Sequence, residues 1–429
     1  MGVVTRFVVS TTTHPVHGPS RCPDDRAARH NRWVTSTEIK NAARHEARLL
    51  WEGNRGLYAL LQAARHTGPI TRVPRLGWVV TDPVLARRVL NDHGRFGMNG
   101  EGGVGHLWTQ LFGDEMAQFF AGTRHAEVRT RARDLFTEDA ARDLVERSQG
   151  RHHAELARRL AAGGTLDVAG AARILSGRMV ADLLGLPADR PDRAYRDLFA
   201  AGERLAGLAL GTTASTELDP ATVNRARAIV DEITAGVPRG YAAGGPGTLL
   251  GRCRAMGLGL PLARGLATLL VIAGTETGAS GTVRTVALLH DTGQQRALLA
   301  NPALMENAVR EGLRVATPAP VIGRHVTRDA IVDGRRLRAG DRVLLLTYLA
   351  TNGAGPFDIH RPYVPDTRQL WFGGGRHLCL GAAVARTQVA RTLSTLHAGG
   401  HPYRIVSRRA ARRVLVPSYA ELRVTLARP

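Results

Sequence analysis

The sequence predicts a mainly α-helical protein with a small β region, folded as a single large domain. Helical segments dominate residues 124–316. Shorter stretches with strand-like alternation occur at 330–349, around a turn at Asp333-Gly334, and again at 403–426. The 429 residues could hold several domains of average size, but candidate functional motifs spread over residues 125–379 are expected to meet at one site. One large domain is therefore the simpler prediction.

The N-terminal part of the chain has three sections. Residues 1–45 contain scattered Thr, Pro, His and Arg with little periodicity, so we expect a weakly ordered extension before a folded domain at 46–429. Residues 68–90 predict a short strand pair followed by a helix. The glycine-rich stretch 91–120 predicts a loop over a pocket for a small molecule.

The net charge of +21 is carried almost wholly by arginine, and Lys40 is the only lysine. Because these arginines are spread along the chain without interleaved aromatic residues or a nucleic-acid-binding motif, we expect no nucleic-acid partner. No segment has the apolar length of a membrane span, and the first residues do not have the pattern of a signal peptide. Three cysteines are too few for a disulfide framework. A reducing, cytoplasmic location is the simplest prediction.

The stretch 372–381, FGGGRHLCLG, presents one cysteine in a glycine-rich loop directly before a predicted helix. Cys379 would lie at the N-terminus of that helix, where unpaired N–H groups and the helix dipole favour the thiolate. The glycines permit backbone angles closed to other residues and let a flat group approach. The stretch therefore predicts a metal ligand beside a planar cofactor. A zinc site would need a further ligand pair, a dinucleotide loop would need a third glycine, and a plain surface turn remains the alternative.

A second candidate lies in residues 266–280, LATLLVIAGTETGAS. These residues are apolar on nearly every side before Gly274, so they predict a buried helix that is too short to span a bilayer. A carboxylate at Glu276 and a hydroxyl at Thr277 are costly in such a helix unless they have partners. The alternative is that Glu276 is solvated and that the Thr277 hydroxyl bonds to the preceding turn.

The decapeptide resembles the haem-binding signature of the cytochrome P450 family at Phe372, Gly375, Cys379 and Gly381, with the histidine of the bacterial form at His377. The resemblance covers about residues 56–429. It implies the fold of that family, one haem b, and Cys379 as the thiolate ligand of the haem iron.

Other parts of the family's machinery follow in the expected order. Residues 273–277 resemble its acid–alcohol element, which implies that Thr277 holds a water or hydroperoxide and that Glu276 relays protons from solvent. Glu311 and Arg314 lie three apart on one helix face and resemble its Glu-x-x-Arg element. This element is a structural lock, whose third member would be Arg361.

The carboxylates of a haem need cationic or hydrogen-bonding anchors. His125 and Arg129, four apart on one helical face, resemble the family's His-x-x-x-Arg pair. Arg324 corresponds to an arginine on the strand that passes the haem. With His377, these residues would give four anchors for two carboxylates.

The resemblance implies a monooxygenase that inserts one oxygen atom from dioxygen into a small-molecule substrate, a secondary metabolite by analogy. Its electrons would come from an acidic ferredoxin and a ferredoxin reductase, steered by an electropositive face. The segment 352–358 is several residues shorter than in most members, which bears on the assignment of Arg361 and on the docking of a redox partner. Two alternatives stay open. One is radical coupling of the substrate at the same site without oxygen insertion, and the other is a non-catalytic basic binding protein.

Overall fold

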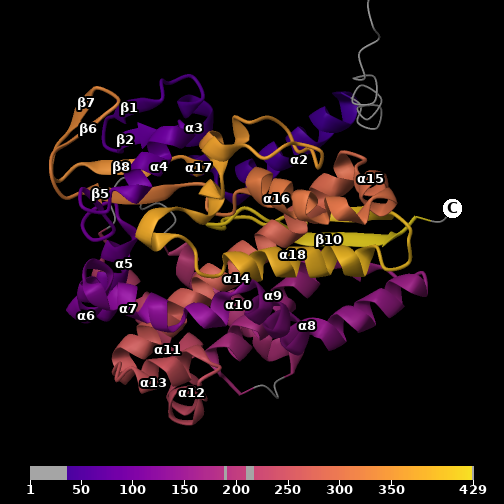
Figure 1. Ribbon diagram of the computed structural model, residues 1–429, viewed down its shortest axis with the longest axis horizontal. Coiled ribbons are helices and arrows are strands. Elements are labelled where there is room, and N and C mark those ends of the chain that lie inside the picture. Colours follow the sequence, from indigo (N-terminus) through magenta and orange to yellow (C-terminus); the bar gives the residue numbers. More distant parts are fainter. Residues whose placement is uncertain (1–35, 188–190, 209–216, 428–429) are drawn as a thin grey trace, which may run out of the picture.

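Helix α14 (Leu260–Asp291) crosses the middle of the molecule, and other helices pack along its length (Figure 1). The structure is a computed structural model that describes residues 36–187, 191–208 and 217–427. Pro261 stands in the first turn of α14, where the missing N–H is not needed, and buried positions follow around the whole helix from Leu262 to Leu289. A helix that is apolar on all sides is stable only when it is buried. The position of α14 in the core follows from this pattern.

The most extensive helix contacts of α14 are with α9 (Val168–Leu184), α10 (Asp192–Gly207), α16 (Met305–Ala316) and α18 (Ala382–Leu396). Helix α8 (Glu138–Ala161) packs on α9 and α18. The remaining described α-helices are α2 (Ser36–Gly53), α3 (Arg55–Ala64), α4 (Pro83–Asn91), α5 (Val104–Phe112), α6 (Asp114–Ala121), α7 (Thr123–Arg131), α11 (Pro220–Thr234), α12 (Val237–Ala243), α13 (Leu249–Ala255), α15 (Gln295–Ala300) and α17 (Thr347–Asn352).

A five-stranded sheet lies at one end of the molecule (Figure 1). Its strand order is β1-β2-β8-β5-β3, in which β2 and β8 are parallel and the other pairs are antiparallel. β5 is its inner strand next to the short edge strand β3 and carries Arg324. The bounds of these strands are β1 Ile70–Val73, β2 Gly77–Val80, β3 Phe96–Gly97, β5 Ile322–Val326 and β8 Arg342–Leu345.

Two smaller sheets complete the β region. Strands β4 (Leu166–Asp167), β10 (Tyr419–Leu426) and β9 (Tyr403–Ala410) form an antiparallel sheet. Strands β6 (Ala330–Val332) and β7 (Arg335–Leu337) form a hairpin. Its two turn residues, Asp333 and Gly334, have φ angles of 50° and 70°, which match the right-handed twist of a two-residue hairpin. The predicted turn is present between β6 and β7, but the next strand, β8, joins the five-stranded sheet.

The mainly α-helical fold with a small β region is confirmed, whereas two local predictions need revision. The stretch 91–120, predicted as a loop, contains β3, α5 and α6. Of the expected N-terminal extension 1–45, residues 1–35 lie outside the described residues, and residues 36–45 are the first part of α2. Glu46 of this helix forms a buried ion pair with Arg284 of α14, 3.1 Å from Nε to Oε2, which anchors α2 to the core.

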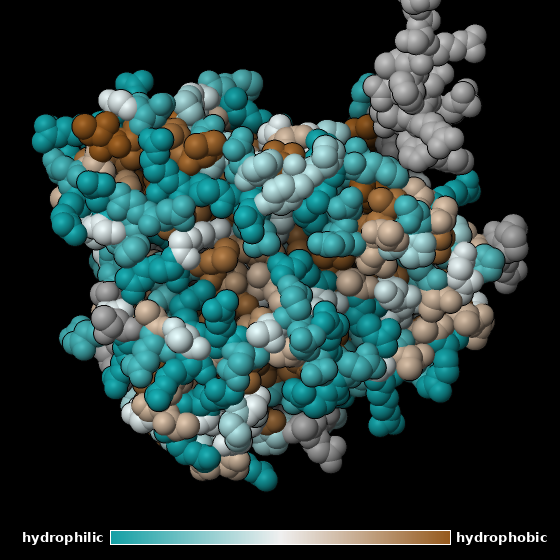
Figure 2. Space-filling view, in the orientation of Figure 1, coloured by the Kyte–Doolittle hydropathy of each residue, from teal (hydrophilic) through white to brown (hydrophobic). Residues whose placement is uncertain are grey.

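Hydrophilic residues cover most of the face shown in Figure 2, and apolar residues gather at the end that carries β6 and β7. Ile331 of β6 is the most exposed large apolar residue of the described chain, at 75%. Within the described ranges, no helix combines the length and apolarity that crossing a membrane requires.

Candidate functional site

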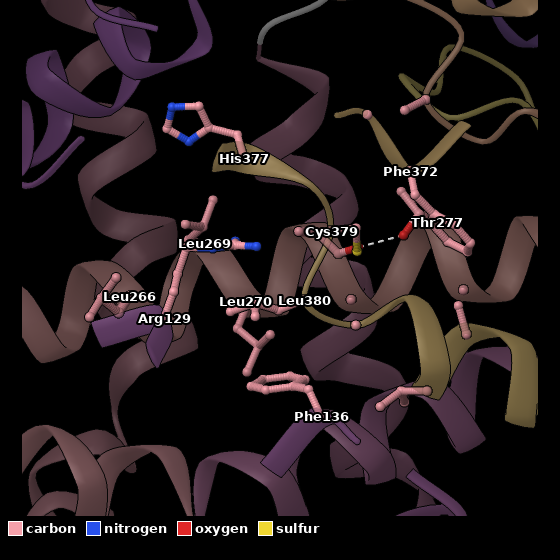
Figure 3. Close-up of a pocket in the computed structure, with 18 of the residues that line it drawn as sticks. Arg129, Phe136, Leu266, Leu269, Leu270, Thr277, Phe372, His377, Cys379 and Leu380 are labelled. Carbon is pink, nitrogen blue, oxygen red and sulfur yellow. Dashed lines mark hydrogen bonds between the residues drawn. The ribbon is translucent and has the colours of Figure 1, made fainter. Parts of the chain in front are cut away.

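A cavity of about 500 Å³ lies between α14 and the loop that precedes α18 (Figure 3). Most of its wall is apolar and comes from α6, α7, α9, α14 and the loop that carries Cys379. Glu276 and Gly375 do not line this cavity. The predicted cofactor and catalytic residues that do line it are His125, Arg129, Thr277, Arg324, Phe372, His377, Cys379 and Gly381.

The loop around Cys379 is shaped by its own backbone and by α4. The N–H of Cys379 donates to the carbonyl of Phe372 at 3.0 Å, which closes the loop. Gly375 has a φ of 61°, and a Cβ there would collide with the carbonyl oxygen of Leu90. Gly375 therefore shapes the loop without touching the cavity, because only glycine combines this angle with this contact. The Cys379 side chain is left exposed toward the cavity.

The structure corrects the prediction that a helix terminus holds Cys379 as a thiolate. Helix α18 begins at Ala382, so Cys379 lies outside its first turn. Burial raises the pKa of the Cys379 thiol above its usual value, against the smaller lowering effects of the Gly381 N–H, Arg129 and Arg386. Burial disfavours a charged sulfur, so the thiolate needs a bound cation beside it. A metal ion would supply that charge.

Two arginines bring positive charge into the cavity wall. Arg324 of β5 is only 4% exposed, its Nη1 donates to the carbonyl of Gly323 at 2.8 Å, and burial lowers its pKa to about 10. Burial also lowers the pKa of Arg129 of α7, which donates to the carbonyl of Leu378. Among the described residues, neither guanidinium has a carboxylate partner within salt-bridge distance. Buried cations without counter-ions favour an anionic ligand.

Two histidines complete this set of hydrogen-bond donors. The rings of His125 and His377 lie 4.6 Å apart. Burial is the first cause that lowers the pKa of His125 to about 4 and that of His377 to about 3, so both rings are neutral at pH 7. The buried Nδ1 of His125 has no hydrogen-bond partner among the described residues. Two neutral rings and two guanidiniums can bind a pair of carboxylates at this wall.

These residues fit a haem. The Cys379 sulfur can bind a metal, the arginines and histidines can hold two carboxylates, and the apolar wall suits a porphyrin ring. A Cβ added to Gly381 would lie 3.8 Å from the Cys379 sulfur, so glycine keeps the space beside the sulfur clear for a flat group. Phe372 contributes an aromatic wall on the same loop (Figure 3).

The structure separates the two members of the acid–alcohol pair. Thr277 faces the large cavity, and its hydroxyl donates to the carbonyl of Ala273 in the preceding turn. Glu276 is 4% exposed and lines a different, much smaller cavity. Burial, and then the charge of Glu203, raises the pKa of Glu276 to about 8. Glu276 is therefore neither solvated nor in contact with the large cavity, while the back-bond considered for Thr277 is present.

The Glu-x-x-Arg residues form a buried ion network. Arg314 donates to both carboxylate oxygens of Glu311, with Nε to Oε1 at 2.9 Å and Nη2 to Oε2 at 2.8 Å. Arg361 donates from Nε to Oε2 of the same carboxylate at 3.1 Å, so the shortened segment 352–358 still lets it reach Glu311. Arg314 also donates to the carbonyls of Thr351 and Gly355 at 3.0 and 2.9 Å. The network ties α16 to the chain that leads to the Cys379 loop.

Sequence reasoning missed residues that have no local pattern. Glu203 of α10 and Arg173 of α9 meet Glu276 in the small cavity although they are far from it in the sequence. Trp108 and Leu269 line the large cavity, but nothing distinguishes them from core residues in the sequence. A helical hydrophobic pattern marks Leu269 only as buried.

Comparisons with known proteins agree with this geometry. The sequence pattern of the cytochrome P450 family matches residues 286–396. Cytochrome P450 105A3 of Streptomyces carbophilus is 38% identical over 138 residues, which are 30% of this chain and 33% of that protein. The 20-oxo-5-O-mycaminosyltylactone 23-monooxygenase of Streptomyces fradiae is 34% identical over 157 residues, which are 35% of this chain and 37% of that protein. The matches thus span about a third of the length of these relatives.

The likeness in three dimensions extends much further along the chain. The crystal structure of CalO2 superposes with a TM-score of 0.70 at 26% sequence identity, covering 87% of this chain and 96% of that one. The structural likeness thus covers most of the chain, whereas His125, Arg129 and Glu276 lie outside the residues matched by the family's sequence pattern.

Proposed function

We propose that the chain is a cytochrome P450 of the bacterial class, a monooxygenase that holds haem b through Cys379 and oxidises a small organic molecule. The observation that carries this proposal is the meeting of a single thiol, exposed to the cavity, with two guanidiniums that have no carboxylate partner among the described residues, in one apolar cavity. When bound there, haem supplies an iron centre for the activation of dioxygen.

Two arginines and two histidines would bind the carboxylates of the cofactor. Arg129 and Arg324 hold the two carboxylates by charge, and His125 and His377 donate neutral hydrogen bonds to them. The low pKa values of both histidines keep this arrangement unchanged through neutral pH. The Glu311 network keeps the Cys379 loop in place from the outside.

Proton supply is the second task of the chain. The hydroxyl of Thr277 lies at the cavity wall, where it can hold a water or pass on a proton. Glu276 precedes it on the same helix and, with a pKa of about 8, carries a proton at pH 7. A general acid is most effective when its pKa lies near the working pH. Glu276 can therefore hold a proton outside the large cavity, and Thr277 can pass a proton on at the wall of that cavity.

The substrate class follows from the cavity wall. Leu266, Leu269, Leu270 and Ile322 are part of a lining that is almost entirely apolar apart from the cofactor anchors. Such a wall binds a largely hydrophobic molecule by excluding water. The Streptomyces fradiae relative is named as a monooxygenase of 20-oxo-5-O-mycaminosyltylactone, which supports a substrate from secondary metabolism.

Electrons would come from an acidic ferredoxin and its reductase. Arg368 and Arg376 lie in or next to the Cys379 loop, whereas Arg386 of α18 forms an ion pair with Glu138. Positive charge there would steer an acidic partner and make the association rate fall with salt.

The catalytic domain on this proposal begins at α2 and includes residues 36–45.

The test is the absorption spectrum of the reduced protein with carbon monoxide. We expect the strongly red-shifted Soret band of a thiolate-bound haem. Cys379→Ser should lose that band, whereas the matched control Cys253→Ser should keep it, because Cys253 is buried in α13 away from the cavity. An ordinary haem–carbon monoxide band in the unchanged protein would overturn the proposal. Turnover under labelled dioxygen then distinguishes oxygen insertion, which labels the product, from radical coupling, which does not.

A further inference from the structure

A second cavity lies beside α14 and shares no lining residue with the large one. It has a volume of about 10 Å³, which is room for one water. Its polar lining comes from four elements, and the rest of its wall is apolar. The polar lining residues are Arg173 of α9, Glu203 of α10, Glu276 of α14, and Ser418 and Tyr419 at the start of β10.

Glu276 presents an unpartnered carboxylate oxygen in this region. The side chain is 4% exposed, and its buried Oε1 has no hydrogen-bond partner among the described residues. A buried polar atom without a partner is costly, and a bridging water is the usual remedy where the site is polar and has room. The small cavity provides both conditions on the side of Glu276 that faces away from the large cavity.

Glu203 reaches the same cavity because α10 packs closely on α14. Gly202, the preceding residue, lies directly against α14: a Cβ there would be 3.5 Å from Oγ1 of Thr275 and from Cγ1 of Val271. Glu203 is partly exposed, so it connects the cavity with solvent. Arg173 stands beside it and is held in place by the carbonyls of Ala420 and Tyr419, at 2.9 and 2.8 Å.

We infer that Glu203 is the outer carboxyl of a two-carboxyl proton route, joined to Glu276 through one water in the small cavity. This inference rests on the proposed function. When Glu276 has given up its proton, protonated Glu203 passes one to the water, and the water passes one to Glu276. Solvent then reprotonates Glu203, so only O–H bonds form and break and no electron moves. Glu203 acts through Glu276 and is a positioning residue.

The charges around Glu276 set the pH range in which this route works. The titratable and charged groups that face it are Glu203, Arg173 and Tyr419. Burial raises the pKa of Glu203, and Arg173 opposes this rise. The charge of Glu203 in turn raises the pKa of Glu276. The negative charge of Glu203 therefore favours the protonated form of Glu276, because two adjacent carboxylates repel each other.

An infrared pH titration of the haem-loaded enzyme at rest tests the pairing without turnover. We expect a protonated-carboxyl band that titrates near pH 8 and is absent from Glu276→Gln. Glu203→Gln should move the midpoint of that band to lower pH, whereas Glu203→Asp should keep it near the original value. The control Asp197→Asn changes an exposed carboxylate on the same helix and should leave the midpoint unchanged.

Turnover supplies a second, independent readout. Glu203→Gln should lower kcat by about tenfold, less than the roughly 100-fold or greater loss expected when a general acid itself is removed, and should shift the pH profile. Glu203→Asp should restore both. A Glu203→Gln enzyme with an unchanged infrared midpoint and an unchanged pH profile would overturn the inference. If the proposed function is wrong, the red-shifted carbon monoxide band is absent. That result is measured independently of the infrared titration, which tests only the pairing of Glu203 with Glu276.

Discussion

Replacing Glu46 with alanine removes the counter-ion of a cation buried in the core. Arg284 of α14 has a side chain that is 1% exposed, and that of Glu46 is 6% exposed. The two groups form a two-pronged contact, with Nε to Oε2 at 3.1 Å, and Nη1 of Arg284 also approaches the carbonyl of Pro417 at 3.5 Å. In Glu46→Ala, that guanidinium stays buried with only backbone carbonyls to solvate it.

The expected loss of stability is large. Removing one partner of a buried ion pair costs about 3–5 kcal/mol, because the remaining charge is uncompensated. The unfolding entropy is about 2.1 cal/mol/K per residue, so over 429 residues a loss of about 4 kcal/mol lowers the melting temperature by about 4 °C. Helix α2 should loosen first, since Glu46 is its anchor on α14.

Thermal unfolding followed by circular dichroism measures this effect. The matched control is Glu155→Ala, which removes an exposed pair with Arg158, whose side chains are 63% and 76% exposed, and should cost less than about 1 kcal/mol. The double variant Glu46→Ala/Arg284→Met should recover most of the loss, because it removes the buried charge as well. A Glu46→Ala protein that melts like the wild type would refute the reasoning.

Three further outcomes can be measured directly. Glu311→Ala leaves Arg314 and Arg361 facing each other without a carboxylate, so we expect a loss of about 3–5 kcal/mol and weaker haem retention, measured by melting temperature and haem content. Thr277→Ala should divert electrons into peroxide, measured as product formed per electron pair, and Thr277→Ser should not; equal coupling in all three proteins would mean that protons arrive by another route. Glu276 has its pKa raised from 4.5 to about 8, so the folded state binds this proton more tightly than the unfolded state does. This proton contributes roughly 5 kcal/mol at most to the free energy of unfolding; the contribution is complete below pH 4.5 and is lost as the pH rises to about 8. In urea denaturation, the free energy of unfolding of Glu276→Gln should lack this pH dependence.

Short-range patterns in the sequence account for the parts of the site that were predictable. The loop 372–381 is contiguous, and Glu311 and Arg314 are neighbours on one turn, so spacing alone brings these groups together. The apolar stretch before Gly274 likewise predicts burial of α14. The motif order then predicted the fold family, and the fold is confirmed.

Contacts across long stretches of chain account for the parts that were not predictable. The pairing of Glu46 with Arg284, and of Glu276 with Glu203, depends on how α2 and α10 pack against α14, which no local pattern encodes. The pKa of Cys379 is likewise raised by burial and lowered to a smaller extent by Arg129 of α7, which is far from it in the sequence.

The sequence by itself therefore determined the chemistry available to this protein, namely a lone thiol, an acid next to an alcohol, and a set of arginines and histidines. The tertiary structure decided which cavity each group faces. Adjacent residues on a helix point about 100° apart. The orientation of α14 about its own axis therefore places Glu276 and Thr277 at different cavities. Packing over the whole domain fixes that rotation.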